Sequence, residues 1–161
     1  PSGRRLALGL GWTAEVAFDR LRVTRTVGCA AERVVATSAQ GSAVFGAHVV
    51  SWRPEVAPGA LERGGWVTWL PGPGWEVRPL QRGDRLMPLG GVGHRPVRRL
   101  LMEARVPRGD RASYPVVVRG ETILWVPGIS RGAAEVPSPG TPAVRVHVTR
   151  DRAAAAADRR A

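Results

Sequence analysis

The chain has 161 residues, 43% of them hydrophobic, so it can bury the core of one domain or of two small domains that share a β scaffold. Its 24 basic and 13 acidic residues give a net charge of +11, and every basic residue is arginine, which favours a polyanionic partner such as nucleic acid. The single cysteine, Cys29, excludes a disulfide framework within the chain and fits a reducing cytoplasm, and no apolar run is long enough to span a membrane. The chain begins at Pro1, which we interpret as an internal start, so we expect a fragment and no export signal.

Short alternating stretches in the first third of the chain predict β-strands. Apolar residues at 16–18 and 21–23 alternate with opposite parity, which a turn or bulge near residues 19–20 would reconcile. Two further strands are predicted at residues 34–36 and 43–50. The stretch that follows, residues 54–65, is rich in Pro, Gly and charge and predicts a loop or a boundary.

The rest of the chain predicts more strands around one helix. Strands are expected at residues 66–70, 75–80, 115–118, 123–126 and 143–149, the third and fourth as a hairpin. Glycines make residues 81–94 irregular, and Pro96 then opens a helix that Pro107 ends. Within that helix, one apolar stripe faces the core and arginines occupy the other face; the stripe consists of Val97, Leu100, Leu101 and Ala104.

Patterns that suggest catalysis or metal binding occur in the wrong context. Residues 9–14 match a loose dinucleotide-binding pattern but precede a strand-like stretch, not a helix. Residues 128–132 match the nucleophile elbow of serine hydrolases, but Pro137 and Pro139 exclude the long helix that an elbow requires. The three histidines (His48, His94 and His147) lack a neighbouring ligand at metal-binding spacing, and without lysine no Walker-type phosphate loop can form. We therefore predict no catalytic residue and no metal site.

A cluster of cationic residues between positions 78 and 111 is more informative. Its nine arginines lie on the glycine-rich loop, on the polar face of the helix and in the loop after it, among three acidic residues (Asp84, Glu103 and Asp110). Gly83, Gly90, Gly91 and Gly93 would let backbone N–H groups approach a phosphate, and the start of the helix would add a partial positive charge. Arginine forks, loop amides and the helix would together grip phosphate. The alternative is a solvated helix face in which Asp84 and Glu103 hold arginines structurally.

Five segments in this region occur in the order and spacing of a known family. They are WEVRPLQRGDRLMPLG (75–90), GHRPVRRLL (93–101), RVPRGDR (105–111), YPVV (114–117) and ILWVPGI (123–129). The set resembles the carboxy-terminal domain of tRNA(Ile)-lysidine synthases, strongly over residues 66–149 and more loosely over 1–65. His94-Arg95 stands where the family often has Lys-Lys, and Leu101-Met102 replaces an aromatic residue late in the helix.

The resemblance implies a fold, a division of the chain and a binding surface. The implied fold is α+β, mostly antiparallel β: a β-sandwich-like domain with one short amphipathic helix, as in phenylalanyl-tRNA synthetase β subunits. Residues 1–65 would be a β-rich preceding segment, 66–150 the tRNA-binding domain and 151–161 a disordered tail. The residues expected to contact tRNA are Arg78, Arg82, Arg85, His94, Arg95, Arg98, Arg99, Arg105, Arg108 and Arg111.

The resemblance also implies a function in two parts. The family uses ATP to adenylate the wobble cytidine of the isoleucine tRNA with a CAU anticodon, and lysine then displaces AMP. That chemistry needs a Ser-Gly-Gly-x-Asp-Ser loop in an amino-terminal domain, and the motif is absent from this chain. We therefore expect a chain inactive alone and without cofactors, with ATP and Mg in the catalytic domain, and with tRNA and that domain as partners in the cytoplasm. The alternatives are a structural or protein-interaction module that docks on the catalytic domain or an acidic partner, for which six tryptophans leave room, and a hydrolase at Ser130.

Overall fold

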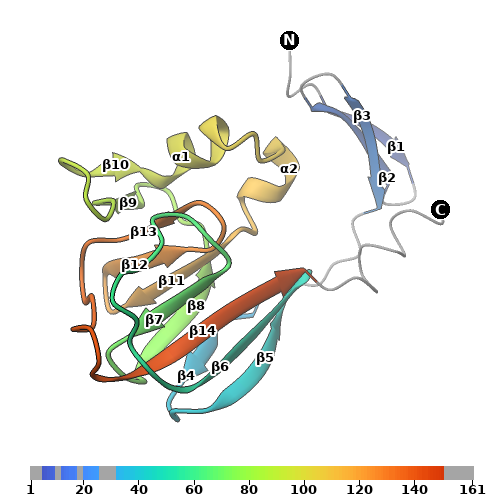
Figure 1. Ribbon diagram of the computed structural model, residues 1–161. Helices are drawn as coiled ribbons and strands as arrows, with labels where there is room; N and C mark the ends of the chain where they lie inside the picture. Colours follow the sequence, from blue (N-terminus) through green and yellow to red (C-terminus); the bar gives the residue numbers. More distant parts are fainter. Residues whose placement is uncertain (1–4, 10–11, 18–19, 26–31, 151–161) are drawn as a thin grey trace.

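Two antiparallel sheets packed face to face form the main body of the protein (Figure 1). The structure, a computed structural model, describes residues 5–9, 12–17, 20–25 and 32–150. The five-stranded sheet runs in the order β13 (Ser130–Arg131), β12 (Thr122–Val126), β11 (Pro115–Arg119), β8 (Trp75–Pro79) and β4 (Val34–Ala36). The four-stranded sheet runs in the order β5 (Gly41–Phe45), β6 (His48–Val56), β14 (Pro142–Arg150) and β7 (Val67–Leu70).

Four shorter elements and a separate small sheet complete the fold. The pair β9 (Arg85–Leu86) and β10 (Arg95–Pro96), helix α1 (Val97–Glu103) and helix α2 (Arg108–Arg111) follow one another between β8 and β11. A three-stranded antiparallel sheet precedes the main body and consists of β1 (Arg5–Gly9), β2 (Trp12–Ala17) and β3 (Arg20–Arg25). The predicted dinucleotide look-alike, the turn near residues 19–20 and the tail 151–161 lie wholly or partly outside the described residues.

The core between the two sheets is aromatic and β-branched. Inward residues of β14 (Val144, Val146 and Val148) pack there against residues of the opposite sheet such as Val77 and Trp125. Trp52 and Trp75 meet edge to face, with ring centroids 5.2 Å apart. Gly41 makes room for this pair, because a Cβ at that position would lie 2.4 Å from the Trp52 ring.

A second core lies on the other face of the five-stranded sheet. Val97, Leu100 and Leu101 of α1 pack there with buried residues of β11 and β12, such as Val116 and Ile123. Because both faces of β11 and β12 are covered, their sequences are continuously apolar instead of alternating. A bulge between these two strands brings Leu124 and Trp125, neighbours in sequence, into the same inter-sheet core.

Most predicted strands are confirmed, and so is the mostly antiparallel α+β sandwich. The prediction of a single strand at 43–50 is wrong, because Gly46, with φ +56°, turns the chain between β5 and β6. Strand β6 continues to Val56, so the predicted loop at 54–65 begins in a strand. Strand pairing also crosses the boundary expected at residue 65: β4 pairs with β8, and β6 pairs with β14. Residues 32–150 are therefore one folded unit.

The predicted helix is confirmed but is shorter than expected. It ends in a Schellman arrangement, in which the Val106 N–H donates to Leu101 O (2.9 Å) and the Arg105 N–H donates to Met102 O (3.0 Å). Arg105 has a φ of +57° at the position where glycine is usual, which costs about 1–2 kcal/mol for a residue with a Cβ. Helix α2 and the β9–β10 pair were not predicted, because each is too short to show a periodicity.

Burial of His48 predicts a loss of stability in mild acid. Its side chain is buried against the rings of Trp66 and Tyr114, and its Nε2 has no hydrogen-bond partner. Burial, and then the charge of Arg150, lower its pKa, although Asp110 acts in the opposite direction. Because the folded state favours the neutral imidazole, stability is present above the unfolded pKa of about 6.5 and is lost as the pH falls through the lower folded value.

The thermal midpoint measured from pH 8 to pH 5 should therefore fall less in His48→Phe than in the wild type. His147→Gln is the comparison: the pKa of His147 is also lowered, by burial and by Arg145, but its side chain is only partly buried, so its profile should differ less from that of the wild type. An unchanged pH profile in His48→Phe would show that this histidine does not contribute.

Candidate nucleic-acid interface

Residues 81–112 form a layer over the outer face of the five-stranded sheet, which we call the cationic layer (Figure 1). Its pieces are tied together by short backbone contacts: the Val97 N–H donates to Asp84 O (2.9 Å), and β9 pairs with β10. The Arg111 Nε–H donates to Val106 O (2.8 Å), which ties α2 to the end of α1. The second core beneath it fixes this layer to the sheet.

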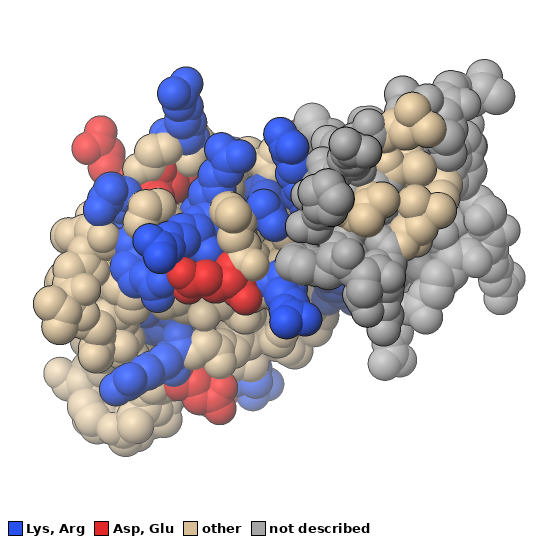
Figure 2. All heavy atoms as spheres, turned by 90° about the horizontal axis from the view of Figure 1, so that it is seen from above, with Lys and Arg blue, Asp and Glu red and all other residues tan. Residues whose placement is uncertain are grey.

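The cationic layer presents many basic side chains to solvent. Figure 2 views it from above and shows arginine side chains gathered over this side of the molecule, with few acidic side chains among them. Seven of the ten predicted tRNA contacts are exposed: Arg82, Arg85, His94, Arg98, Arg99, Arg105 and Arg108. Arg95 and Arg111 are half-buried. The structure thus brings nine of the ten residues into one layer.

Arg78, the tenth residue, lies elsewhere and is engaged within the protein. It is 7% exposed in β8, and it donates to both carboxylate oxygens of Asp84 at 2.8 and 2.9 Å. Burial alone would raise the pKa of Asp84, but hydrogen bonds from Arg78 and from the Gln81 N–H outweigh it and hold this pKa below its ordinary value. We therefore assign Arg78 to the scaffold and not to the exposed surface of the cationic layer.

Glu103 holds two arginines of the layer at the surface. Arg95 donates to both of its carboxylate oxygens at 2.8 and 2.7 Å, and Arg99 donates to one at 3.2 Å. The hydrogen bond from Arg95 is the main cause of the lowered pKa of Glu103. These exposed ion pairs stabilise the fold little, but they orient two guanidinium groups on one face. Asp84 therefore holds its arginine inside the protein, as the structural alternative expected, whereas Glu103 and its two arginines lie at the surface.

Helix α1 contributes to the cationic layer by positioning its arginine side chains more than by the partial charge at its own end. Helix α1 has only seven residues and no side-chain N-cap, so its start adds little partial positive charge to the layer. Three loop glycines, Gly83, Gly90 and Gly93, have positive φ values of 90°, 69° and 73°. These values are open to glycine at little cost, which explains the glycine-rich sequence of the loop.

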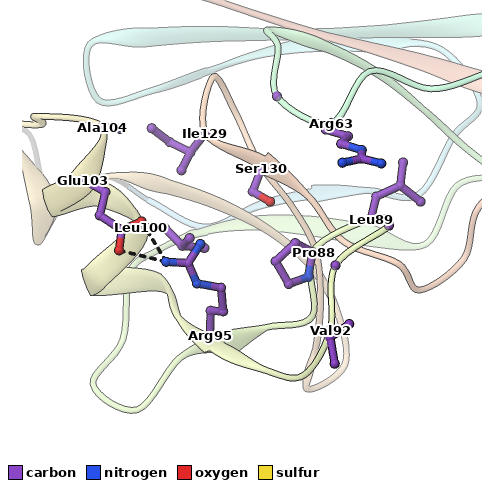
Figure 3. A pocket seen from close by; sticks show the side chains of 13 residues that line it. Arg63, Pro88, Leu89, Val92, Arg95, Leu100, Glu103, Ala104, Ile129 and Ser130 are labelled. Atoms are coloured by element: carbon purple, nitrogen blue, oxygen red, sulfur yellow. Dashed lines mark hydrogen bonds and ion pairs between the residues drawn. The ribbon is translucent and has the colours of Figure 1, made fainter.

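Arg63, which the sequence did not single out, and Ser130, which it suggested only as an elbow serine, lie at a pocket beside this layer. Figure 3 shows Arg63 and Ser130 in its wall, opposite Arg95 and α1. Arg63 is in the stretch predicted as a loop or boundary, and its carbonyl accepts the Arg131 N–H at 2.6 Å. No sequence pattern links residues 63, 95 and 130, because only the fold brings them together.

Arg131, next to the predicted elbow serine, is fully buried and has a structural role. It donates to four backbone carbonyls (Leu124, Gly132, Ala134 and Glu135) at 2.5–3.0 Å. Burial lowers its pKa to about 10, and Glu135 partly opposes this. Residues 132–141 contain no helix, so the strand–turn–helix geometry of a nucleophile elbow is missing around Ser130.

Among the residues that the structure describes, no three His, Cys, Asp or Glu side chains gather where they could hold a metal ion. Within the same ranges, no helix is long and apolar enough to cross a membrane.

The fold and its basic layer define a class of protein: a mostly antiparallel α+β domain with a candidate nucleic-acid interface. Comparisons with known proteins show which family it is similar to. Residues 75–148 match the family model described as TilS substrate C-terminal domain. A solved chain described as the crystal structure of TILS C-terminal domain superimposes with a TM-score of 0.63 at 20% identity, covering 74% of this chain and 98% of that one. At this identity, the superposition establishes a shared fold.

Curated relatives of this chain are described as tRNA(Ile)-lysidine synthases. The tRNA(Ile)-lysidine synthase of Symbiobacterium thermophilum is 45% identical over 82 residues, which cover 50% of this chain and 17% of that protein. The tRNA(Ile)-lysidine synthase of Geobacter sulfurreducens is 37% identical over 78 residues, covering 48% and 17%. Over its matched region, the chain is similar to the C-terminal domain of tRNA(Ile)-lysidine synthases. The matches span only about a sixth of those relatives.

Proposed function

We propose that this chain is the tRNA-binding module of a tRNA(Ile)-lysidine synthase, and that it contacts tRNA through the cationic layer. The observation that carries the proposal is the set of six exposed arginines and His94 on one layer of a domain similar to this family. Double-stranded RNA is recognised mainly by its shape and backbone, so a surface of arginine forks without stacking aromatics suits it.

The arrangement favours phosphate contacts over general solubility. Glu103 fixes Arg95 and Arg99 in place, which lowers the entropy lost when these side chains bind a phosphate. Arginine can bind phosphate in a bidentate manner, and the exposed Arg82, Arg98 and Arg108 add to the same field. The layer would thus position the tRNA body, while the reaction takes place elsewhere.

In the proposed parent enzyme, another domain carries out the catalysis. In it, a cytoplasmic catalytic domain would bind ATP and Mg and join lysine to the wobble cytidine of the isoleucine tRNA with a CAU anticodon. The present chain would act with that domain and with tRNA, and would have no activity alone.

The rival proposal is docking on the catalytic domain or on an acidic protein. Purification of the 161-residue chain, followed by the ratio of absorbance at 260 nm to that at 280 nm and by gel-shift assays with transcribed tRNA, tests both. Co-purified nucleic acid and a shifted tRNA band are expected. A chain that is free of RNA and does not shift tRNA, but binds the catalytic part of the Symbiobacterium relative, would contradict tRNA binding and favour docking.

A further inference from the structure

A pocket lies between the glycine-rich loop, the end of α1 and the turn that leads into β13. Residues 88–92 form one side, Leu100, Glu103 and Ala104 another, and Ile129 and Ser130 the third (Figure 3). Its volume is about 540 Å³. Pockets of this size enclose a whole small organic ligand, whereas a lone phosphate would leave most of the space unfilled.

One part of the wall of this loop pocket is apolar. Pro88 and Leu89 lie across from Leu100 of α1, and Ile129 and Ala104 close the side between them (Figure 3). Such walls bury the flat, weakly polar faces of a heterocycle. The ligand should therefore contain a ring system as well as charge.

Two guanidinium groups supply charge for the other part of the ligand. Arg95 is held by Glu103 on the α1 side of the pocket. Arg63, from the loop before β7, lies over Gly90, where a Cβ would be only 2.8 Å from its Nη2. Glycine at position 90 therefore has two roles: it adopts the positive φ of the loop, and it leaves room for the Arg63 side chain.

A hydroxyl group supplies the third element of recognition. Ser130 is 8% exposed, and its Oγ points into the loop pocket (Figure 3). Its hydrogen bond to Arg131 O, at 3.5 Å, is at the limit for such a bond. This buried hydroxyl is thus able to donate a better hydrogen bond to a ligand.

We propose that the loop pocket takes one unpaired nucleotide of the bound RNA, an inference that rests on the proposed function. The base lies among Pro88, Leu100 and Ile129, its phosphate meets Arg63 and Arg95, and Ser130 donates to the base edge or the ribose. Proteins often bind unpaired RNA bases that are splayed out of the helix, with hydrogen bonds to the base edges and guanidinium groups beside the base. The cationic layer would then hold the duplex while the loop pocket reads a single-stranded nucleotide next to it.

The test uses two hairpin RNAs that differ only in a single-stranded 3′ extension. Ala104→Trp fills the mouth of the pocket without changing charge, and Met102→Trp is its control, since Met102 is exposed on α1 but does not line the pocket. Ala104→Trp should weaken binding of the extended hairpin about tenfold and leave the blunt hairpin unchanged. Met102→Trp should affect neither.

Three further outcomes are decisive. Equal effects of Ala104→Trp on both hairpins, or no effect on either, would overturn the nucleotide pocket while leaving RNA binding intact. If the wild type bound neither hairpin, the proposed function itself would fail. Saturation by free 5′-AMP or 5′-CMP, without any preference for the extended hairpin, would assign the pocket to a free nucleotide instead.

A second variant guards against misfolding. If Ala104→Trp lowers the thermal midpoint, Arg63→Gln replaces it, because Arg63 is exposed and its backbone makes the structural contact. Arg63→Gln should also reduce the preference for the extended hairpin.

Discussion

Asp84→Ala is expected to destabilise the protein by about 3–5 kcal/mol, because it leaves the buried guanidinium of Arg78 without its counterion. The two side chains are only 8% and 9% exposed, so water cannot replace the lost pairing. The Asp84 carboxylate also accepts the Gln81 N–H, so the same change removes a hydrogen bond that orders the loop leading to α1. Urea denaturation of both proteins measures the free energy of unfolding.

A double-mutant cycle separates the charge from the packing. Arg78→Met combined with Asp84→Ala should be less destabilised than Asp84→Ala alone, since no uncompensated charge remains. A loss below about 1 kcal/mol in Asp84→Ala would mean that Arg78 finds solvent or another acceptor, and that the pair does not anchor the layer.

The joint change Arg98→Ala and Arg99→Ala is expected to weaken tRNA binding at least tenfold at about 0.1 M salt, because two exposed phosphate ligands are removed. The free energy of unfolding should change by less than about 1 kcal/mol, since Arg98 is exposed and the Arg99–Glu103 pair is a surface ion pair. Filter binding and thermal melting of the same samples measure both quantities.

The matched control removes the same charge outside the cationic layer. Arg33 and Arg53, with side chains 58% and 64% exposed, lie before β4 and on β6. Their joint replacement by alanine should leave tRNA affinity within about twofold of the wild type, apart from the small effect of net charge. An equal loss in both double variants would point to diffuse attraction in place of a defined surface.

The parts of the fold that follow from local pattern could be predicted. The alternation of Val144, Val146 and Val148 identified β14, the hairpin signature identified β11 and β12, and Pro96 and Pro107 bracketed α1. Gly46 was not recognised as a turn, because the apolar residues on both of its sides read as one continuous strand.

The fate of each arginine depends on which layers cover a strand. In β8, Val77 faces the inter-sheet core, so alternation placed Arg78 on the outside. That outer face of the sheet is itself covered by the cationic layer, which buries Arg78 against Asp84. Arg131 shows the same limit: its sequence context is that of a surface arginine, yet the fold buries it among four carbonyls.

The candidate site likewise has one part that could be predicted from the sequence and one part that could not. The cationic layer is contiguous in sequence, so charge and glycine content were enough to predict it. The loop pocket joins Arg63, Arg95 and Ser130 across long sequence separations, and only the tertiary packing brings them together.

The salt dependence of tRNA binding by the wild-type chain tests the central claim most directly. Bound cationic side chains release condensed counterions, so the logarithm of the association constant should fall linearly with the logarithm of salt concentration, with a slope steeper than about −3. The slope should become shallower by about 1–2 in the Arg98→Ala, Arg99→Ala variant. Affinity that does not change between about 0.05 and 0.3 M salt would contradict a phosphate-binding surface on the cationic layer.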